Sequence, residues 1–179
     1  MKISTVLIGL GTVVSLGGCA VAATDKGADI GQQALALMKS SFQDRGQATV
    51  DRLVQDDVQR ICSEPDDGSQ ARKDKLAAIE KAELAAVKPP SDGKYLGDFV
   101  AGEKVAQTGV GFQWSDKPGA PAGGNCYACH QMSKKEISFG NMGPSLYNYG
   151  KLRGDSAPIM EYTWNKLQNA KAYNACSTM

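Results

Sequence analysis

The sequence predicts an all-α fold. Apolar residues recur at helical spacing in three stretches of the first half, and again in two shorter stretches of the second half. Runs rich in glycine, proline and acidic residues separate these stretches, as expected of turns between helices. With 179 residues, the chain can form one domain with an appendage, or two small domains.

Residues 1–23 are typical of a signal peptide. Lys2 is followed by an uncharged run that ends in small residues at Ala23. The run is about long enough to span a bilayer, but its glycines and its small-residue end favour cleavage over a retained anchor. Two cleavage sites compete: an Ala-x-Ala site within residues 20–23, and a lipobox-like Leu-Gly-Gly-Cys that would leave a lipid on Cys19. Either way the mature chain is expected in the periplasm, where disulfides persist.

Residues 24–93 are expected to form a helical extension. Its first helix begins at Asp29, a suitable N-cap, and ends before Gly46. Its third helix covers residues 70–88 and stops at the Pro89-Pro90 pair, because proline cannot continue a helix. The simplest interpretation is a helical subdomain that packs on the rest of the chain. A docking surface for a partner subunit is the alternative.

The second helix of the extension is expected to be continuous. Thr49 can cap its N-terminus, and apolar residues at helical spacing form one stripe along it. The members of this stripe are Val50, Leu53, Val54, Val58, Ile61 and Cys62. The polar residues 63–68 then end the helix in a turn.

The second half contains the sequence Cys126-Tyr127-Ala128-Cys129-His130. Two cysteines followed directly by a histidine at this spacing are typical of c-type haem attachment. On a helix, residues i and i+3 share a face, so both thiols can form thioethers to a single haem c while His130 binds its iron. Zinc and thioredoxin-like sites also use Cys-x-x-Cys. However, His130 is the only histidine, no second Cys/His pair exists for zinc, and no βαβ pattern surrounds the motif.

The composition agrees with a fold that wraps a cofactor. Aromatic residues make up only 7% of the chain and 20 residues are glycines, so a haem would supply apolar mass that the side chains lack. The net charge is +1, from 20 basic and 19 acidic residues, and this balance gives no reason to expect a nucleic-acid partner.

The sequence around the motif predicts two further helices and a long loop. The helices cover residues 98–109 and 157–168. The loop, residues 110–124, is rich in glycine and proline, and its Phe112 and Trp114 are expected to pack on the haem edge or under the loop itself.

Beyond the motif, Gly143-Pro144 forms a turn whose Pro144 carbonyl can accept a hydrogen bond from the ring nitrogen of His130 that does not bind iron. Such a contact fixes the imidazole and raises its basicity. A group of polar and aromatic residues then follows, which either borders the haem and its propionates or lies at the surface. This group is Tyr147, Tyr149, Lys151 and Arg153.

The sixth iron ligand is a methionine, another side chain or an open position, since a second histidine does not exist. Met132 is too close to His130 to cross the haem ring. Met142 lies on the His130 side, and Met160 falls within a predicted apolar helix. Met179 is left, at the end of an irregular segment that can fold over the opposite face. A thioether ligand raises the reduction potential relative to a second imidazole.

Three segments of the chain resemble the SoxX family, the mono-haem subunits of the SoxAX cytochromes of bacterial sulfur oxidation. They are residues 124–130, residues 143–153 and residues 173–179, which end in Cys-Ser-Thr-Met. The resemblance implies a class I cytochrome c domain in residues 94–179, with His130 and Met179 as axial ligands. Family members continue past this methionine into a proline-containing turn and a final helix, so the domain is expected to be truncated.

The resemblance also implies electron transfer, with no catalysis by this chain alone. A SoxA-like cytochrome subunit would form a heterodimer with it and carry the catalytic haem of an L-cysteine S-thiosulfotransferase. There thiosulfate is joined to a cysteine of the carrier protein SoxY. This chain would accept the electrons and pass them to a downstream soluble cytochrome. The alternatives are a free-standing periplasmic mono-haem carrier, and a haem-based sensor or ligand-binding module with an open sixth position.

The last two cysteines, Cys62 and Cys176, are expected to form a disulfide. Cys19 is either removed or lipidated, and the haem motif uses the other two. In an oxidising compartment two remaining thiols tend to pair. Two separate buried thiols, or bridges to a partner chain, are the alternatives. The disulfide would tie the helical extension to the segment that carries Met179.

Overall fold

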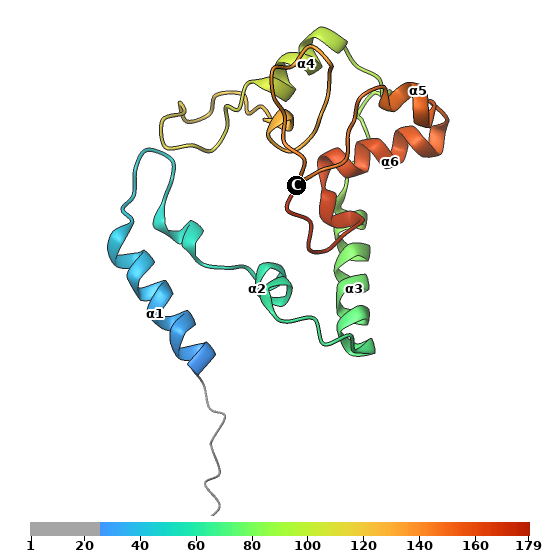
Figure 1. Ribbon diagram of the computed structural model, residues 1–179. Coiled ribbons are helices and arrows are strands. Elements are labelled where there is room, and N and C mark those ends of the chain that lie inside the picture. Colours follow the sequence, from blue (N-terminus) through green and yellow to red (C-terminus); the bar gives the residue numbers. More distant parts are fainter. Residues whose placement is uncertain (1–25) are drawn as a thin grey trace, which may run out of the picture.

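The computed structural model describes residues 26–179, and the predicted signal peptide with Cys19 lies outside this range. The described residues form α-helices and 3-10 helices without a β-strand, which confirms the all-α expectation for this part of the chain. The α-helices are α1 (Lys26–Ser41), α2 (Asp57–Ser63), α3 (Gln70–Ala86), α4 (Phe99–Gln107), α5 (Tyr149–Arg153) and α6 (Ala157–Gln168) (Figure 1). The 3-10 helices are η1 (Val50–Leu53), η2 (Cys126–Ala128) and η3 (Ala170–Ala172). None of these described helices has the length and hydropathy to cross a bilayer.

Side-chain caps explain where several helices begin. Ser69 accepts a hydrogen bond from the backbone N–H of Arg72 and starts α3, and the Asp98 carboxylate accepts from the N–H of Ala101 and starts α4. Such caps satisfy N–H groups that have no partner inside the helix. After α4, the backbone reverses at Gly109, whose φ of +60° favours glycine. The helices expected near residues 70–88, 98–109 and 157–168 are therefore confirmed.

The expectation of one continuous helix from residue 50 to residue 62 is wrong. The chain forms the short η1, leaves helical geometry, and starts again at α2. The cause is a capping box at Asp56, whose carboxylate accepts from the N–H of Gln59 at 2.7 Å while its own N–H donates to the Gln59 side chain at 2.9 Å. Because these reciprocal bonds favour a helix start at Asp57, the apolar stripe is divided between two elements.

The best-buried part of the structure lies where α3 meets the C-terminal segment. Ala170, Ala172 and Ala175 are buried there. Two acidic side chains of α3 bond this segment: Glu83 accepts from the Asn169 side chain at 2.6 Å, and Glu80 accepts from the N–H of Ala175 at 3.1 Å. The third helix of the extension thus packs on the rest of the chain.

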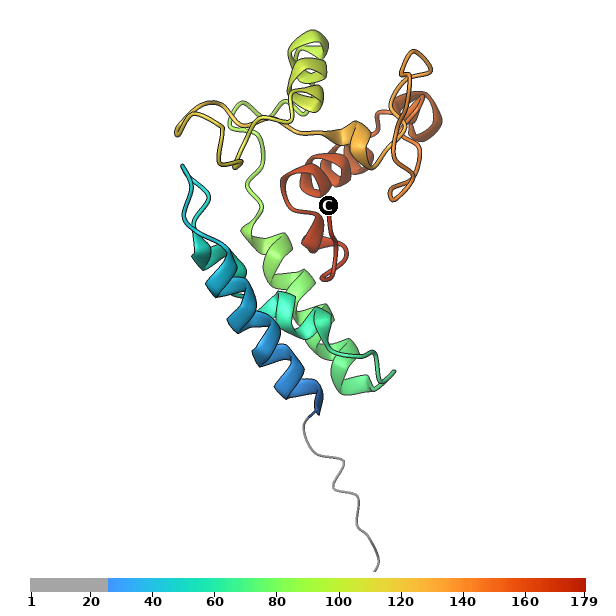
Figure 2. The same ribbon diagram turned by 60° about the vertical axis from the view of Figure 1, so that its left-hand side comes forward.

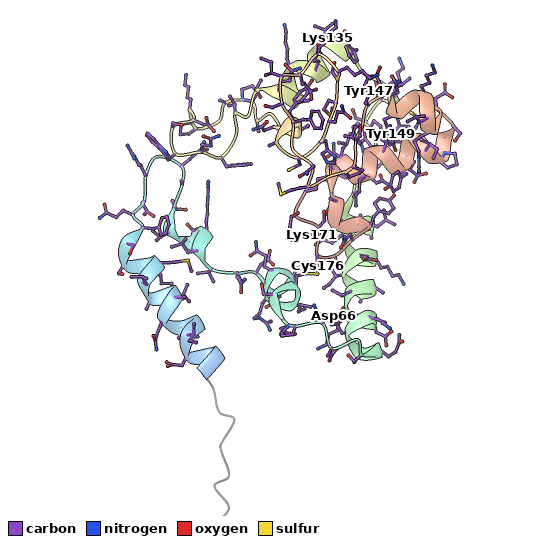
Figure 3. The ribbon with its side chains drawn as sticks, in the orientation of Figure 1. Asp66, Lys135, Tyr147, Tyr149, Lys171 and Cys176 are labelled. Carbon is purple, nitrogen blue, oxygen red and sulfur yellow. A yellow bond between two sulfur atoms is a disulfide. The ribbon has the colours of Figure 1, made fainter. Side chains whose placement is uncertain are left out.

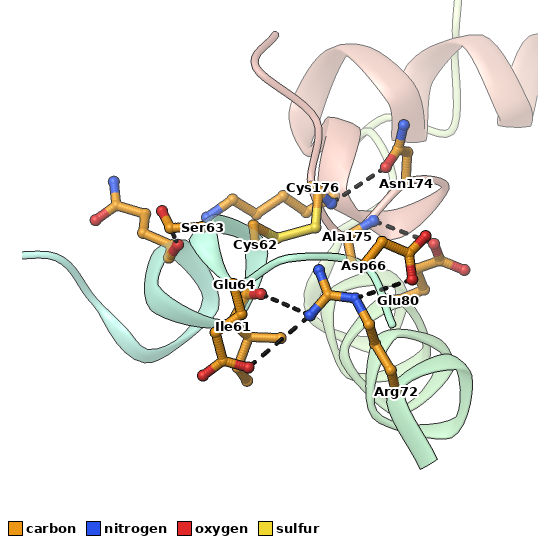
Figure 4. Close-up of a disulfide and its surroundings, with 12 residues drawn as sticks. Ile61, Cys62, Ser63, Glu64, Asp66, Arg72, Glu80, Asn174, Ala175 and Cys176 are labelled. Carbon is orange, nitrogen blue, oxygen red and sulfur yellow. Dashed lines mark hydrogen bonds and ion pairs between the residues drawn. A yellow bond between two sulfur atoms is a disulfide. The ribbon is translucent and has the colours of Figure 1, made fainter. Parts of the chain in front are cut away.

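The expected disulfide between Cys62 and Cys176 is present, with Cα atoms 5.4 Å apart. It joins the end of α2 to the C-terminal segment, beside α3 (Figure 4). Arg72 of α3 lies next to it, donates to the Ile61 carbonyl at 3.0 Å, and forms an ion pair with Asp66 at 3.5 Å. α2, α3 and the C-terminal segment are therefore held together at one place.

α6 contacts the segment that follows α3 and also contacts α5. Its Trp164 donates an indole hydrogen bond to the Lys88 carbonyl just after α3, and packs edge-on against Tyr95. On another face of α6, the hydroxyl of Thr163 lies 2.9 Å from the hydroxyl of Tyr149 in α5. Trp164 and Thr163 therefore join α6 to segments that lie before and after the Cys-x-x-Cys-His motif in the sequence.

The α1–η1 arm, residues 26–53, contacts the loop of residues 111–116 through its tip. Gln47 donates to the Gly111 carbonyl at 2.8 Å, and Arg52 donates to the Phe112 carbonyl at 2.5 Å. The guanidinium of Arg45 stacks on the Trp114 ring at 3.5 Å. Phe112 and Trp114 thus face arginines of the arm instead of the interior of their own loop. This corrects the expectation that they pack under their own loop, while packing on a haem edge stays a prediction. Cation–π attraction at an exposed site explains the observed contacts.

Replacing Gly46 by alanine tests this docking. A Cβ at position 46 would overlap the carbonyl oxygen of Trp114, and the φ of +56° also disfavours alanine. We expect the free energy of unfolding to fall by about 1–3 kcal/mol, measured by urea denaturation.

The matched control is Gly119→Ala, which has a similar φ of +76° but open space around the Cβ. It carries the backbone strain without the steric overlap, so its loss of stability should be smaller. Equal losses of unfolding free energy in the two variants would show that Gly46 is not in close contact with the Trp114 backbone.

Candidate functional site

The Cys-x-x-Cys-His motif forms one tight turn. η2 begins at Cys126, and the Cys126 carbonyl accepts from the N–H of Cys129 at 3.2 Å and of His130 at 2.8 Å. The longer attachment helix assumed from the sequence is therefore reduced to a single 3-10 turn. In 3-10 geometry residues i and i+3 eclipse each other, so Cys126 and Cys129 still lie on one side.

The turn is attached to α4 on its N-terminal side. The N–H of Gly124 donates to the Val105 carbonyl at 2.6 Å, and the Gln107 side chain donates to the Tyr127 hydroxyl at 3.0 Å. A Cβ at Gly123 would overlap the Thr108 hydroxyl, so only glycine permits this close approach. These contacts fix the position of the turn that carries the two cysteines.

The chain after His130 loops outward and returns to the motif. The N–H of Gly140 donates to the Tyr127 carbonyl at 2.7 Å, and the N–H of Gly143 donates to the Cys129 carbonyl at 2.8 Å. A Cβ at Gly140 would overlap the Ala128 carbonyl. The role of Gly140 as a support of the site was not predicted from the sequence, because a single glycine in a loop carries no periodic signal.

The His130 ring has a defined orientation. Its Nδ1 lies 2.7 Å from the Pro144 carbonyl oxygen, which is the hydrogen bond expected from the Gly143-Pro144 turn. Because a carbonyl can only accept, Nδ1 carries the proton, and in the neutral imidazole Nε2 then presents a lone pair. The ring also lies directly against Gly143, where a Cβ would overlap it. The site thus offers one imidazole nitrogen as a ligand.

Cys126 and Cys129 are both free thiols and half-buried, whereas Cys62 and Cys176 are bonded to each other. Cys126, Cys129, His130 and Pro144 are therefore brought together in one turn and its returning loop. Among the described residues, no group of three or more His, Cys, Asp or Glu side chains converges as a bare metal ion would require.

Met179 lies on a different part of the fold. Its N–H donates to the Ser177 hydroxyl at 3.3 Å, and its side chain is 61% exposed. It lines a cavity of about 300 Å³ together with Glu83, Lys166 and residues 167–171. In the two views of Figures 1 and 2 the C-terminus lies below η2. The axial pairing of His130 with Met179 stays a prediction.

The residues expected to border the cofactor have separate contacts. The Lys134 ammonium lies 5.1 Å from the centre of the Tyr147 ring, and the Tyr149 hydroxyl points to Thr163 of α6. Figure 3 places Tyr147 and Tyr149 near each other beside α5 and α6, with Lys135 above them. Tyr149 therefore has a structural contact that sequence analysis did not anticipate. Lys151 and Arg153 are exposed on α5.

The sequence matches no protein-family model. It is similar to an uncharacterized lipoprotein of Aquifex aeolicus (strain VF5), with 36% identity over 127 residues. These residues make up 70% of this chain and 59% of the relative, so the chain spans less than two thirds of the relative's length.

Proposed function

We propose that this chain is a mono-haem c-type cytochrome that transfers electrons. The observation that carries the proposal is the arrangement at η2, where two free thiols on one turn are followed by a histidine. The Nδ1 of this histidine is already bonded to the Pro144 carbonyl. A histidine held in this way has one tautomer and one orientation, which is what metal-binding imidazoles require.

The residues present fit a covalently attached haem. Cys126 and Cys129 would form the two thioethers, and Nε2 of His130 would bind the iron. When bound, the haem supplies a one-electron redox centre. The chain's own part is to hold the imidazole: Pro144 fixes the proton on Nδ1, and Gly143 lets the ring lie against the backbone.

We further propose that the chain acts as the SoxX-like subunit of a SoxAX-like complex, beside a SoxA-like catalytic partner. The three resembling segments support this assignment. The disposition of cysteines also supports it: within residues 26–179, two cysteines are bonded to each other and the other two belong to the attachment motif. Once a haem has taken Cys126 and Cys129, the described part of the chain leaves no thiol for sulfur chemistry, and electron transfer is the role that fits.

Purification of the native protein from detergent-solubilised membranes tests the subunit role. A second haem protein should co-purify with it at a constant ratio. The Cys62–Cys176 bond should be intact in that complex, because it is made within the chain. A chain that runs alone as a monomer would favour the free-standing carrier.

Met179→Ala tests the sixth ligand. Methionine ligation gives a weak near-infrared charge-transfer band, which this variant should lose. Met142→Ala is the matched control, because Met142 is also exposed but lies next to Gly143 on the His130 side, and the band should remain. If the unmodified ferrous protein bound CO at once, the sixth position would be open and the sensor alternative would be favoured.

We propose that the chain is exported and carries a lipid on Cys19. The similarity to a lipoprotein of Aquifex aeolicus supports the lipobox-like sequence over the Ala-x-Ala alternative. Mass spectrometry of the N-terminal peptide distinguishes the two, because lipoprotein processing leaves a diacylated N-terminal cysteine. A free alanine or threonine at the N-terminus would contradict the lipidation.

A further inference from the structure

α1 carries an apolar face that no other element of the described chain covers. Ile30, Leu37 and Phe42 are 64%, 67% and 58% exposed, respectively. Ile30 and Leu37 lie on one side of the helix together with Ala34 and the partly exposed Met38. Phe42 comes directly after the last residue of α1, and its N–H still donates to the Met38 carbonyl at 2.9 Å. A contiguous exposed apolar stripe of this kind usually marks a contact surface.

The other side of α1 is polar. The Gln33 side chain donates to the Asp29 carboxylate at 2.9 Å, and Gln32, Lys39 and Ser40 occupy neighbouring positions. Among the helices of the described chain, α1 packs chiefly on η1, and in Figure 1 it lies apart from α3. The helix is therefore amphipathic, with its polar side available to water.

We infer that the apolar face of α1 lies in the surface of a lipid membrane, as an interfacial helix. The inference rests on the lipidation of Cys19 proposed above. Lys26 comes only seven positions after Cys19, and a chain extends by at most about 3.6 Å per residue, so α1 would begin within about 25 Å of the lipid. A lipid surface is thus the apolar partner that is always within reach.

The lipid on Cys19 and the apolar face of α1 would each strengthen the membrane binding of the other. A lipid anchor turns the insertion of α1 into an intramolecular step with a high effective concentration, so a few apolar side chains are enough. The diacylated cysteine already holds the protein at the membrane, and α1 would add a second contact beside it.

The arm would also set the orientation of the haem motif. α1 has 16 residues and is about 24 Å long. The tip that follows it is fastened to residues 111–116 by Gln47 and by the stacking of Arg45 on Trp114. The loop that contains this docking site leads into η2, so a helix lying on the membrane would hold the site at a fixed position above it.

Hydrogen–deuterium exchange of the lipidated full-length protein tests the inference. The protein is compared in detergent-free buffer and on vesicles of phosphatidylethanolamine and phosphatidylglycerol in equal parts. Amide exchange in peptides that cover residues 30–42 should slow about tenfold or more on vesicles, because an inserted helix opens less often.

Two matched triple variants make the test specific. Ile30→Gln/Leu37→Gln/Phe42→Gln keeps good helix formers on α1 and should abolish the protection. Leu96→Gln/Phe99→Gln/Leu152→Gln replaces similarly exposed apolar residues elsewhere and should leave the protection intact.

The outcomes separate this inference from the lipidation on which it rests. If the protein carries the lipid and α1 exchanges equally fast with and without vesicles, the interfacial helix is refuted while lipidation stands. If residues 30–42 are protected without vesicles and in proportion to protein concentration, a second copy covers this face and the inference is wrong. An N-terminus without lipid removes the tether and overturns both.

Discussion

Replacing both Cys62 and Cys176 by serine is expected to lower the free energy of unfolding by about 4–5 kcal/mol. The disulfide joins residues 114 positions apart, and closing so long a loop restricts the unfolded chain strongly. The loss is large against the about 5–15 kcal/mol that stabilises a typical domain. Urea denaturation of the oxidised protein and of the double variant measures the difference.

The reduced wild-type protein is the control, because it lacks the bond but keeps both sulfur atoms. It should unfold at the same urea concentration as the double variant. A loss below about 1 kcal/mol in both would show that the bond does little for stability. If Met179 is the sixth ligand, the double variant should also have a lower reduction potential while its thioether-bound haem is retained.

Gly143→Ala is expected to disturb the candidate site directly at His130. The new Cβ would overlap the His130 ring, so the ring must move and its hydrogen bond to the Pro144 carbonyl must lengthen or break. Overpacking of this kind costs about 1–3 kcal/mol. If His130 binds the haem iron as proposed, the haem-loaded variant should have an altered visible spectrum, because the imidazole loses its orientation.

Gly150→Ala is the matched control for this prediction. Gly150 lies in α5, and nothing lies within 4 Å of the position where its Cβ would be. Alanine in a helix should be neutral or stabilise the protein by up to about 1 kcal/mol. A Gly143→Ala variant with the spectrum and stability of Gly150→Ala would mean that the ring of His130 is not confined by the backbone.

The sequence predicted the fold best where local signals agree with packing. α6 has the bounds that its apolar spacing predicted, residues 157–168, with a proline at its start. The prediction of one continuous second helix in the extension was wrong because Asp56 and Gln59 form a capping box inside an apolar stripe. That box has a sequence signature, an acidic or hydroxyl residue followed three positions later by glutamine or glutamate, and it can be detected.

The local parts of the candidate site were predicted from the sequence, and its long-range contacts were not. Cys126, Cys129 and His130 are contiguous, so their proximity follows from the chain itself. The bond from His130 to Pro144 was expected because a Gly-Pro turn presents a free carbonyl. The stacking of Arg45 on Trp114 joins residues 69 positions apart, and no local pattern predicts such a contact. Only the folded chain reveals it.

The most direct test of the central proposal is the mass of the mature protein after denaturation. It is produced with a c-type cytochrome maturation system and alkylated without reductant. We predict that the chain retains the mass of one haem and takes up no alkyl label, because two cysteines hold the haem and two form the disulfide. A chain without the added mass, and with labels on Cys126 and Cys129, would contradict the assignment of this site.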